Sequence, residues 1–426
     1  MHVTAHLDVD LAAVEATDTV TLMLDLQAPE AVADPTAVRP EHTAIVVPDR
    51  SGSMSGHRLE AAKRALIDLV ARLDDRDTFG LVTFDDTTQV VAPASKVADH
   101  DRDRLARLIS AIEPGGMTDL SGGYLRGLQE ARRGAGSAGA TIVLLSDGHA
   151  NAGVTDPAAL RQVAAKAGAQ SITTSTIGIG HGYDQDLLAE IATGGNGNHS
   201  FAADADSAAA ALLAEVEGLL SKAAQAASLL ITPTNDVTGI GILNDLPAHA
   251  GSGGIMVELG DFYSGETRRL LLELHIPAMA ALGLAQAAEL ILTYVELPAL
   301  TQHTVTLPVS VSVVPADVAA QRVPSPEVHR EKLLLSAQAA KRASEDALAR
   351  GDYDPARTTL DGAATALAAM PGAAITDEVA AEIAWLPQTR DGLTDWDPGY
   401  TSKRLRAEAN RKSRGYKGRD QGGERP

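Results

Sequence analysis

The sequence predicts a doubly wound α/β domain that is inserted into an antiparallel β-sandwich and followed by a helical region. Between residues 40 and 226, short apolar runs alternate with segments whose apolar residues recur at helical spacing. Strands that alternate with helices form a mostly parallel sheet covered on both faces. Between residues 228 and 316 the helical period disappears, and Gly, Pro and Asp separate strand-like runs, as in a sandwich. The helical period returns between residues 325 and 388.

The α/β domain is predicted mainly from its strands. Thr43–Val47 is a short, continuous apolar run, which is typical of a strand buried on both faces. Asp156 and Pro157 mark the start of one helix, because Asp is a favoured N-cap and Pro a favoured first residue. The same reasoning predicts strands at Thr78–Phe84, Thr87–Ala92, Ala140–Ser146, Ser171–Ile179 and Asn198–Phe201, and helices at His57–Leu73, Asp101–Ile112, Ser121–Arg133, Asp156–Gly168, Asp184–Thr193 and Asp206–Ala226.

Residues 1–38 contain two further strand-like runs, His2–Asp10 and Thr19–Gln27. Two strands are too few to form a stable domain by themselves. We therefore expect them to join the sandwich, which makes the α/β domain an insertion within a β domain. The other sandwich strands are expected at Leu229–Pro233, Val237–Leu243, Gly254–Leu259, Arg268–Ile276, Glu289–Leu297 and Thr304–Val314.

The C-terminal part of the chain divides into helices and a basic tail. Glu327–Arg350 and Pro355–Met370 are expected to form a helical hairpin, and Ile375–Trp385 a third helix. The tail, residues 400–426, carries nine Lys and Arg from Lys403 onward. We expect a flexible, solvated end. The alternative is a basic arm that docks on an acidic partner or on this protein's own acidic body.

Composition excludes several classes of function. The 426 residues include 36 basic and 56 acidic side chains, for a net charge of −20. This charge disfavours nucleic-acid or anionic-membrane binding through the main body. The absence of cysteine excludes disulfides, zinc-thiolate sites and thiol catalysis, and it fits a reducing compartment. Because no run reaches the roughly 18 uninterrupted apolar residues that a spanning helix needs, we expect a soluble, cytoplasmic protein without membrane contact.

The first candidate site residues lie between a buried strand and a helix. Asp49, Ser51 and Ser53 occupy alternate positions directly after the strand, and Gly52 and Gly56 allow a tight turn. In open α/β sheets, ligands bind at the carboxyl ends of the strands. A loop of this kind can direct three oxygens at one point. Oxygen ligands suit a hard cation such as Mg²⁺ or Mn²⁺.

Two later loops fall at equivalent edges of the predicted sheet. Thr118 lies in a Gly-rich loop before a helix. Asp147 directly follows the buried strand Ala140–Ser146 and precedes Gly148, as Asp49 follows its own strand. These two residues would add a hydroxyl and a carboxylate to the first three oxygens.

The five residues, in this order and strand context, resemble the von Willebrand factor A domain with its metal-ion-dependent adhesion site. The family motif is Asp-x-Ser-x-Ser followed by a Thr and an Asp from two later loops. The resemblance covers roughly residues 40–225, including the segments FGLVTFDD and TIGIGHGYDQDLLAEIATGGNG. The remaining layout is similar to bacterial proteins in which such a domain sits beside a β-sandwich and a helical segment.

The resemblance implies a function as well as a fold. It implies that Asp49, Ser51, Ser53, Thr118 and Asp147 hold Mg²⁺ or Mn²⁺, the hydroxyls directly and the carboxylates through water. The cation then keeps an open position, which an Asp or Glu of a protein partner can fill. On this interpretation the protein is a cation-dependent protein-binding module and not an enzyme.

Two alternatives stay open at the level of sequence. The metal site could be vestigial in a metal-independent scaffold, or a Mg²⁺ could serve phosphoryl transfer or hydrolysis. An enzyme needs a general base, for which His57, His149 and Asp119 are the nearby candidates. We expect both histidines at the rim, Asp119 either as a helix cap or as a residue that supports the ligands, and Asp85 and Asp86 as turn residues.

Overall fold

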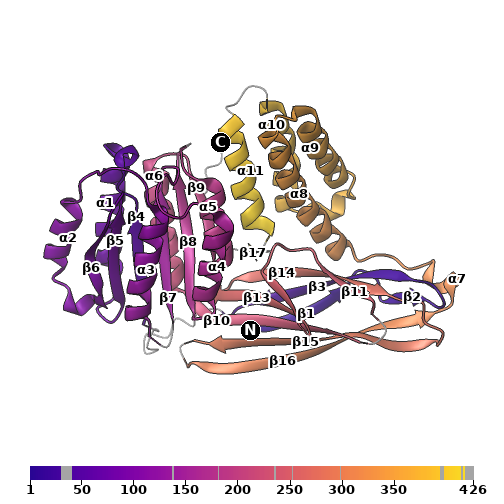
Figure 1. Cartoon of the computed structure of the whole chain (residues 1–426). Helices are drawn as coiled ribbons and strands as arrows, with labels where there is room; N and C mark the ends of the chain where they lie inside the picture. The colour runs from indigo at the N-terminus through magenta and orange to yellow at the C-terminus, as the bar shows by residue number, and fades with distance from the viewer. Residues whose placement is uncertain are drawn as a thin grey trace.

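The computed structural model describes residues 1–29, 41–136, 139–180, 182–234, 237–251, 253–297, 299–393, 398–413 and 416–417. An α/β domain, an antiparallel β-sandwich and a group of helices lie side by side (Figure 1). The fold class predicted from the sequence is therefore confirmed. The last part of the expected N-terminal segment, residues 30–38, and residues 414–415 and 418–426 of the expected tail lie outside the described residues.

The α/β domain is built on a six-stranded sheet. The strands follow the order β6 (Thr88–Lys96), β5 (Thr78–Phe84), β4 (Thr43–Pro48), β7 (Ala140–Ser146), β8 (Ile172–Ile179) and β9 (Asn196–Ala202). Only β6 runs antiparallel to its neighbour. Every residue of β4, β5, β7 and β8 is buried, which explains why β4 and β7 are mostly apolar runs.

Helices cover both faces of this sheet. Leu66, Leu105 and Leu212 form one core on the first face, and they come from α1 (His57–Arg72), α2 (Arg102–Ser110) and α6 (Ala205–Leu220). The second face is covered by α3 (Leu120–Gly134), α4 (Pro157–Gly168) and α5 (Gln185–Gly194). Two short 3-10 turns, η1 (Gly52–Met54) and η2 (Val97–Asp99), connect elements of the domain.

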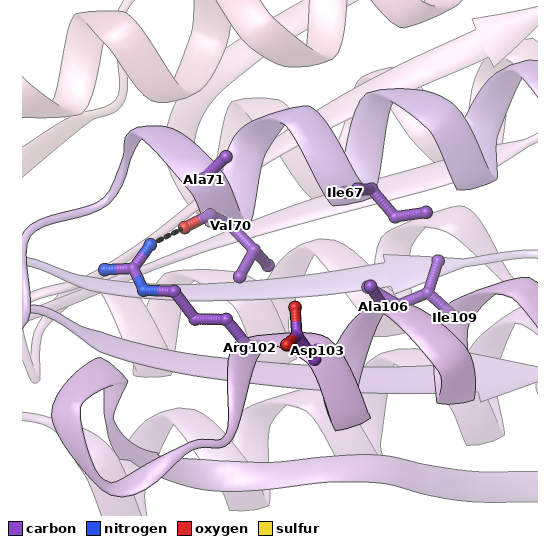
Figure 2. Close-up of a pocket in the computed structure, with 7 residues that line it drawn as sticks. All are labelled: Ile67, Val70, Ala71, Arg102, Asp103, Ala106 and Ile109. Carbon is purple, nitrogen blue, oxygen red and sulfur yellow. Dashed lines mark hydrogen bonds between the residues drawn. The ribbon is translucent and has the colours of Figure 1, made fainter.

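A small recess separates α1 from α2. It has a volume of about 170 Å³ and is lined mainly by apolar side chains, among them Ile67, Val70 and Ile109 (Figure 2). The Arg102 guanidinium donates to the backbone oxygen of Val70 at one end. The recess is thus a packing feature between two helices, on residues separate from the predicted site.

The sandwich contains strands from both sides of the α/β domain. One sheet has the order β1 (His2–Leu7), β3 (Asp18–Gln27), β14 (Thr267–Ile276) and β11 (Gly239–Ile242), with β17 (Tyr416–Lys417) also paired to β14. The other has the order β12 (Ala248–Gly251), β13 (Gly254–Tyr263), β10 (Lys222–Pro233), β15 (Gly283–Glu296), β16 (Thr301–Val314) and β2 (Leu11–Ala13). Because β3 pairs with β14 along its whole length, the α/β domain is an insertion, as the sequence predicted.

The two faces of strand β3 are buried by two different sets of side chains. Leu22, Leu24 and Leu26 point into the core between the two sheets. Met23, on the opposite face, packs with Leu271, Val328 and Leu335. The last two residues belong to α8 (Pro326–Ala349), so this helix covers the outer face of the sandwich. This second contact explains why the run Thr19–Gln27 does not alternate cleanly in sequence.

The helical region follows the short helix α7 (Ala316–Ala319). It consists of α8, α9 (Tyr353–Ala368), the turn η3 (Gly372–Ala374), α10 (Asp377–Gly392) and α11 (Pro398–Ser413). Leu334, Leu360, Leu386 and Leu405, one from each long helix, share its core. No helix among the described residues is long and apolar enough to cross a membrane.

The expected helix Asp206–Ala226 is wrong in its last residues. Helix α6 ends at Leu220, and β10 already begins at Lys222. The Lys222 ammonium lies 2.6 Å from the Asp261 carboxylate, which also accepts a bond of 3.0 Å from Thr173. This buried ion pair fixes the start of β10 against β13 and β8. The helical spacing of alanines in the sequence does not indicate this ion pair, and so it did not predict where α6 ends.

The expectation of a flexible tail is also wrong for residues 400–413 and 416–417. These form α11 and β17, and α11 lies between the α/β domain and the other helices (Figure 1). Arg406 Nε lies 3.0 Å from Glu345 of α8, and the same guanidinium contacts Asp186 of α5. The basic residues here dock on the protein's own acidic body, which was the alternative left open by the sequence.

A buried carboxylate ties α11 to the helical region. Glu382 is 1% exposed and lies 2.5 Å from the Lys341 ammonium and 2.8 Å from that of Lys412. Burial opposes ionisation of Glu382, but the two ammonium groups outweigh this effect and hold its pKa at about 2. Lys341 is itself fully buried, and its ammonium lies 4.1 Å from the centre of the Trp385 ring.

Glu382→Gln should therefore destabilise the protein strongly. The substitution leaves the buried Lys341 without its carboxylate, and breaking a buried pair in this way costs about 3–5 kcal/mol. The measurement is the free energy of unfolding in urea. Asp391→Asn, an exposed acid on the same helix, is the matched control and should change it by about 0.5 kcal/mol or less. Equal effects of the two substitutions would contradict the role given to Glu382.

Candidate functional site

The predicted site residues come from three loops at one edge of the α/β sheet. Asp49 follows β4, Ser51 directly precedes η1, and Ser53 lies within η1. Thr118 precedes α3, and Asp147 directly follows β7. β4 and β7 are parallel neighbours, so their carboxyl ends lie side by side. The sheet topology thus places all three loops together.

Three hydroxyls and one carboxylate converge in these loops. Ser51 Oγ lies 3.1 Å from Ser53 Oγ, which donates to Asp147 Oδ1 at 2.6 Å. An added Cβ on Gly148 would lie 3.2 Å from both Ser53 Oγ and Thr118 Oγ1, and 4.0 Å from Ser51 Oγ. Gly148 therefore leaves open the space on which the hydroxyls converge, and a side chain there would fill it.

Asp49 is connected to these loops through hydrogen bonds with Ser51 and Ser146. It is fully buried, and its Oδ1 accepts the backbone N–H of Ser51 at 2.7 Å while Oδ2 accepts the Ser146 hydroxyl at 2.7 Å. Burial raises the pKa of Asp49 to about 6, although the bonds from Ser146 and Ser51 act in the opposite direction. The Asp147 carboxylate adds to the rise by repulsion. The loops thus concentrate negative charge where water is largely excluded.

The site is closed on one side and open on the other. Asp49, Ser51, Thr118 and Asp147 are all buried, whereas Ser53 is exposed. On the open side, Arg58 Nη1 donates to Asp147 Oδ2 at 2.6 Å. Because Ser53 is exposed, a ligand can reach the converging hydroxyls from solvent.

A buried ion pair holds the Thr118 loop against the Asp49 loop. Arg50 Nη2 lies 2.9 Å from Asp85 Oδ2, and the Arg50 carbonyl accepts the N–H of Gly115 at 2.6 Å. The Asp85 carbonyl accepts the N–H of Asp119 at 2.8 Å. An added Cβ on Gly115 would lie 1.7 Å from Asp85 Oδ2, so only glycine fits there. Asp85 is thus an anchor between loops as well as a turn residue.

Several supporting residues were missed by the sequence analysis. Ser146 and Arg58 both contact the carboxylates, and Asn151 Oδ1 accepts the N–H of Thr118 at 2.8 Å. Ser146 carried a usable signal, because it is the polar last residue of a mostly apolar strand. Arg50 and Arg58 carried none, since basic residues after a strand or at a helix start are common on protein surfaces.

The other polar residues near the site have separate contacts. Asp119 caps α3 by accepting the N–H of Gly122 at 2.8 Å, as predicted. His57 is exposed and lies 3.9 Å from Asp206 on α6. His149 is exposed and lies 3.8 Å from Asp184. Both histidines thus sit at the rim, paired with acids outside the five-residue group.

Comparison with known proteins identifies the class of domain that this sheet and these loops form. Residues 45–215 match the family model of the von Willebrand factor type A domain, so the chain contains such a domain. Among curated proteins, it is 28% identical over 242 residues to the uncharacterized protein sll0103 from Synechocystis, and 27% identical over 172 residues to inter-alpha-trypsin inhibitor heavy chain H3 from Homo sapiens. These matches cover 54% and 39% of this chain, but only 56% and 19% of the relatives.

Two solved structures are similar over nearly the whole chain. One is a von Willebrand factor type A protein from Catenulispora acidiphila, with a TM-score of 0.72, 17% identity and coverage of 97% of this chain and 96% of that one. The other is the ArnB paralog VWA2 from Sulfolobus acidocaldarius, with a TM-score of 0.64, 14% identity and coverage of 96% and 97%. At such identities the likeness concerns the fold: the domain, the sandwich and the helices recur together.

Asp85→Ala should disturb the site through the loop that carries Thr118. It leaves the half-buried Arg50 guanidinium without its carboxylate, and loss of such a buried charged partner costs about 1–3 kcal/mol. Urea unfolding should show this loss. Asp86→Ala removes an exposed acid from the next position and should leave stability nearly unchanged. If both variants behaved alike, the Arg50–Asp85 pair would not be the anchor described here.

Proposed function

We propose that this domain is a divalent-cation-dependent protein-binding module of the bacterial type. Asp49, Ser51, Ser53, Thr118 and Asp147 would hold Mg²⁺ or Mn²⁺, and an Asp or Glu of a protein partner would complete the coordination. The observation that carries the proposal is the convergence of three hydroxyls and the Asp147 carboxylate near Gly148. One of these hydroxyls belongs to Ser53, which is exposed.

The donor set fits a hard cation. All five side chains offer oxygen, the ligand atom that Mg²⁺ and Mn²⁺ prefer. Among the described residues, no three His, Asp or Glu side chains gather in a metal-binding cluster. In the proposed site, hydroxyls would supply three of the five ligands. A bound dication would also offset the cost of burying Asp49, whose pKa burial raises to about 6. Gly148 supports the same interpretation, because a side chain there would crowd the hydroxyls of Ser53 and Thr118.

The two kinds of ligand would have different tasks. Resemblance to the family implies that the hydroxyls of Ser51, Ser53 and Thr118 contact the cation directly, and that the carboxylates act through water. A bound cation would then supply a positive charge that neutral direct ligands do not cancel. The open side at Ser53 would admit a partner's carboxylate, which gains a charge-assisted contact.

An enzymatic role is disfavoured by the surroundings of the possible bases. Asp119 is engaged in capping α3 and bonds the Ser121 hydroxyl at 2.8 Å. His57 and His149 lie near Asp206 and Asp184, on the exposed rim. A general base must reach the group whose proton it takes, and none of these three bonds to the converging hydroxyls. We therefore propose a binding function without turnover.

The remaining alternative is a scaffold that acts without metal. The continuous sandwich and helical region would suit it, but it gives no reason for three hydroxyls to converge beside two buried carboxylates. The acidic chain, with a net charge of −20, supports a protein partner and not nucleic acid. Cytoplasmic location is part of the proposal, since a cysteine-free chain suits a reducing compartment.

Metal binding should stabilise the protein. Mg²⁺ or Mn²⁺ at about 100 times its Kd should add about 2.7 kcal/mol to the free energy of unfolding, because the folded state alone presents the site. EDTA should remove the effect. Ser53→Ala deletes one converging hydroxyl and should greatly reduce the shift. Ser55→Ala, whose hydroxyl instead bonds the Gly52 carbonyl, should retain it. A melting temperature that is unchanged across millimolar metal would contradict the proposal.

Partner binding should depend on the same site. Immobilised protein should retain partners from its native lysate in Mg²⁺ and release them in EDTA. The Ser53→Ala variant should fail to retain them even in Mg²⁺, while Ser55→Ala should behave as the unchanged protein. For a captured partner, replacing its contacting Asp or Glu by Asn or Gln should abolish retention. Partners that stay bound in EDTA and to both variants would favour the metal-independent scaffold.

A further inference from the structure

A guanidinium stands at the open side of the candidate site. Arg58 lies in the first turn of α1, five residues after Ser53. Its Nη1 donates to Asp147 Oδ2 at 2.6 Å and to the Ser53 carbonyl at 3.4 Å. The Asp147 side chain is fully buried, whereas that of Arg58 is 40% exposed. The arginine therefore joins a buried carboxylate of the site to solvent.

The backbone of a neighbouring loop makes room for this side chain. Gly180, just after β8, has a φ of 67°, a conformation that favours glycine. An added Cβ at Gly180 would lie 3.1 Å from Arg58 Nη2. The guanidinium is thus held between the Ser53 loop, Asp147 and Gly180. Its place is defined by three separate segments of the chain.

The charge of the site depends on this residue. Asp49 and Asp147, when both are ionised, give the site two negative charges, and Arg58 offsets one of them. A bound dication then leaves a net positive charge. Without Arg58 the same loaded site would be neutral. Since charges at short range interact strongly in partly buried surroundings, this difference acts on both the cation and any anion that follows.

We propose that Arg58 sets the selectivity of the site for anionic partners, weakening its hold on the cation and strengthening its hold on a carboxylate. This inference rests on the proposed function. Arg58 repels the dication and competes for Asp147, so it lowers metal affinity. Once the metal is bound, the exposed guanidinium attracts the incoming carboxylate and offers it further N–H donors. One residue thus has opposite effects on two successive binding steps.

The test uses Mn²⁺ and acetate as probes on the full chain. Titration calorimetry gives the Kd for Mn²⁺. The relaxation of the acetate methyl protons by bound Mn²⁺ gives the Kd for acetate at the loaded site. Arg58→Gln should bind Mn²⁺ about three- to tenfold more tightly and acetate about three- to tenfold more weakly, as expected for one charge removed at short range.

Two further variants separate charge from position. Arg58→Lys keeps the charge and should stay close to the unchanged protein in Mn²⁺ affinity, with weaker acetate binding because it lacks the planar fork. Arg64→Gln removes the same charge from a more distant, exposed place on α1 and should alter both constants by less than about twofold. Circular dichroism in EDTA checks that every variant is folded.

The outcomes are distinct. Weaker Mn²⁺ binding in folded Arg58→Gln would show that Arg58 merely positions Asp147, and it would overturn the inference. Unchanged acetate affinity in Arg58→Gln would overturn it too, while leaving the metal site intact. If the unchanged protein bound no Mn²⁺, the proposed function itself would fail, and this inference with it.

Discussion

The parallel pairing of β4 with β7 holds the two carboxylates of the candidate site together. The ladder continues one step past β4, where the N–H of Asp49 donates to the Leu145 carbonyl at 2.8 Å. The Ser146 hydroxyl then reaches the Asp49 carboxylate, and Asp147 is the next residue. A slip of one residue would turn these side chains to the opposite faces of the sheet. The hydroxyl loops can converge only because this register is fixed.

Buried ion pairs recur at the places where the parts of the molecule meet. The Asp261 carboxylate pairs with the Lys222 ammonium and accepts a hydrogen bond from Thr173, which links the sandwich to the α/β domain. The Glu382 carboxylate forms ion pairs with Lys341 and Lys412, which links α11 to the other helices. In a chain with 56 acidic and 36 basic residues, a lysine or arginine at a join compensates an acid that would be costly to bury alone. Arg58 at Asp147 follows the same pattern, but its exposure leaves it accessible to a ligand.

These joins make the three parts one continuous structure. β10 follows α6 with a single residue between them, and α11 contacts both α8 and α5. The same combination of parts recurs in the two solved structures that match nearly the whole chain. The sandwich and helices are therefore in direct contact with the domain.

The sequence by itself determined the fold class and the five candidate site residues. Mostly apolar runs identified the buried strands β4 and β7, and the spacing of Asp49, Ser51 and Ser53 marked a loop at a strand end, because these signals lie within short segments. Tertiary structure decided where α6 stops, why residues 398–413 fold, and that Arg50, Arg58 and Asp85 support the site. Each of these depends on a charged partner distant in sequence, such as Asp261 for Lys222 or Glu382 for Lys412. No local pattern records such a partner, since only the packed chain brings the two charges together.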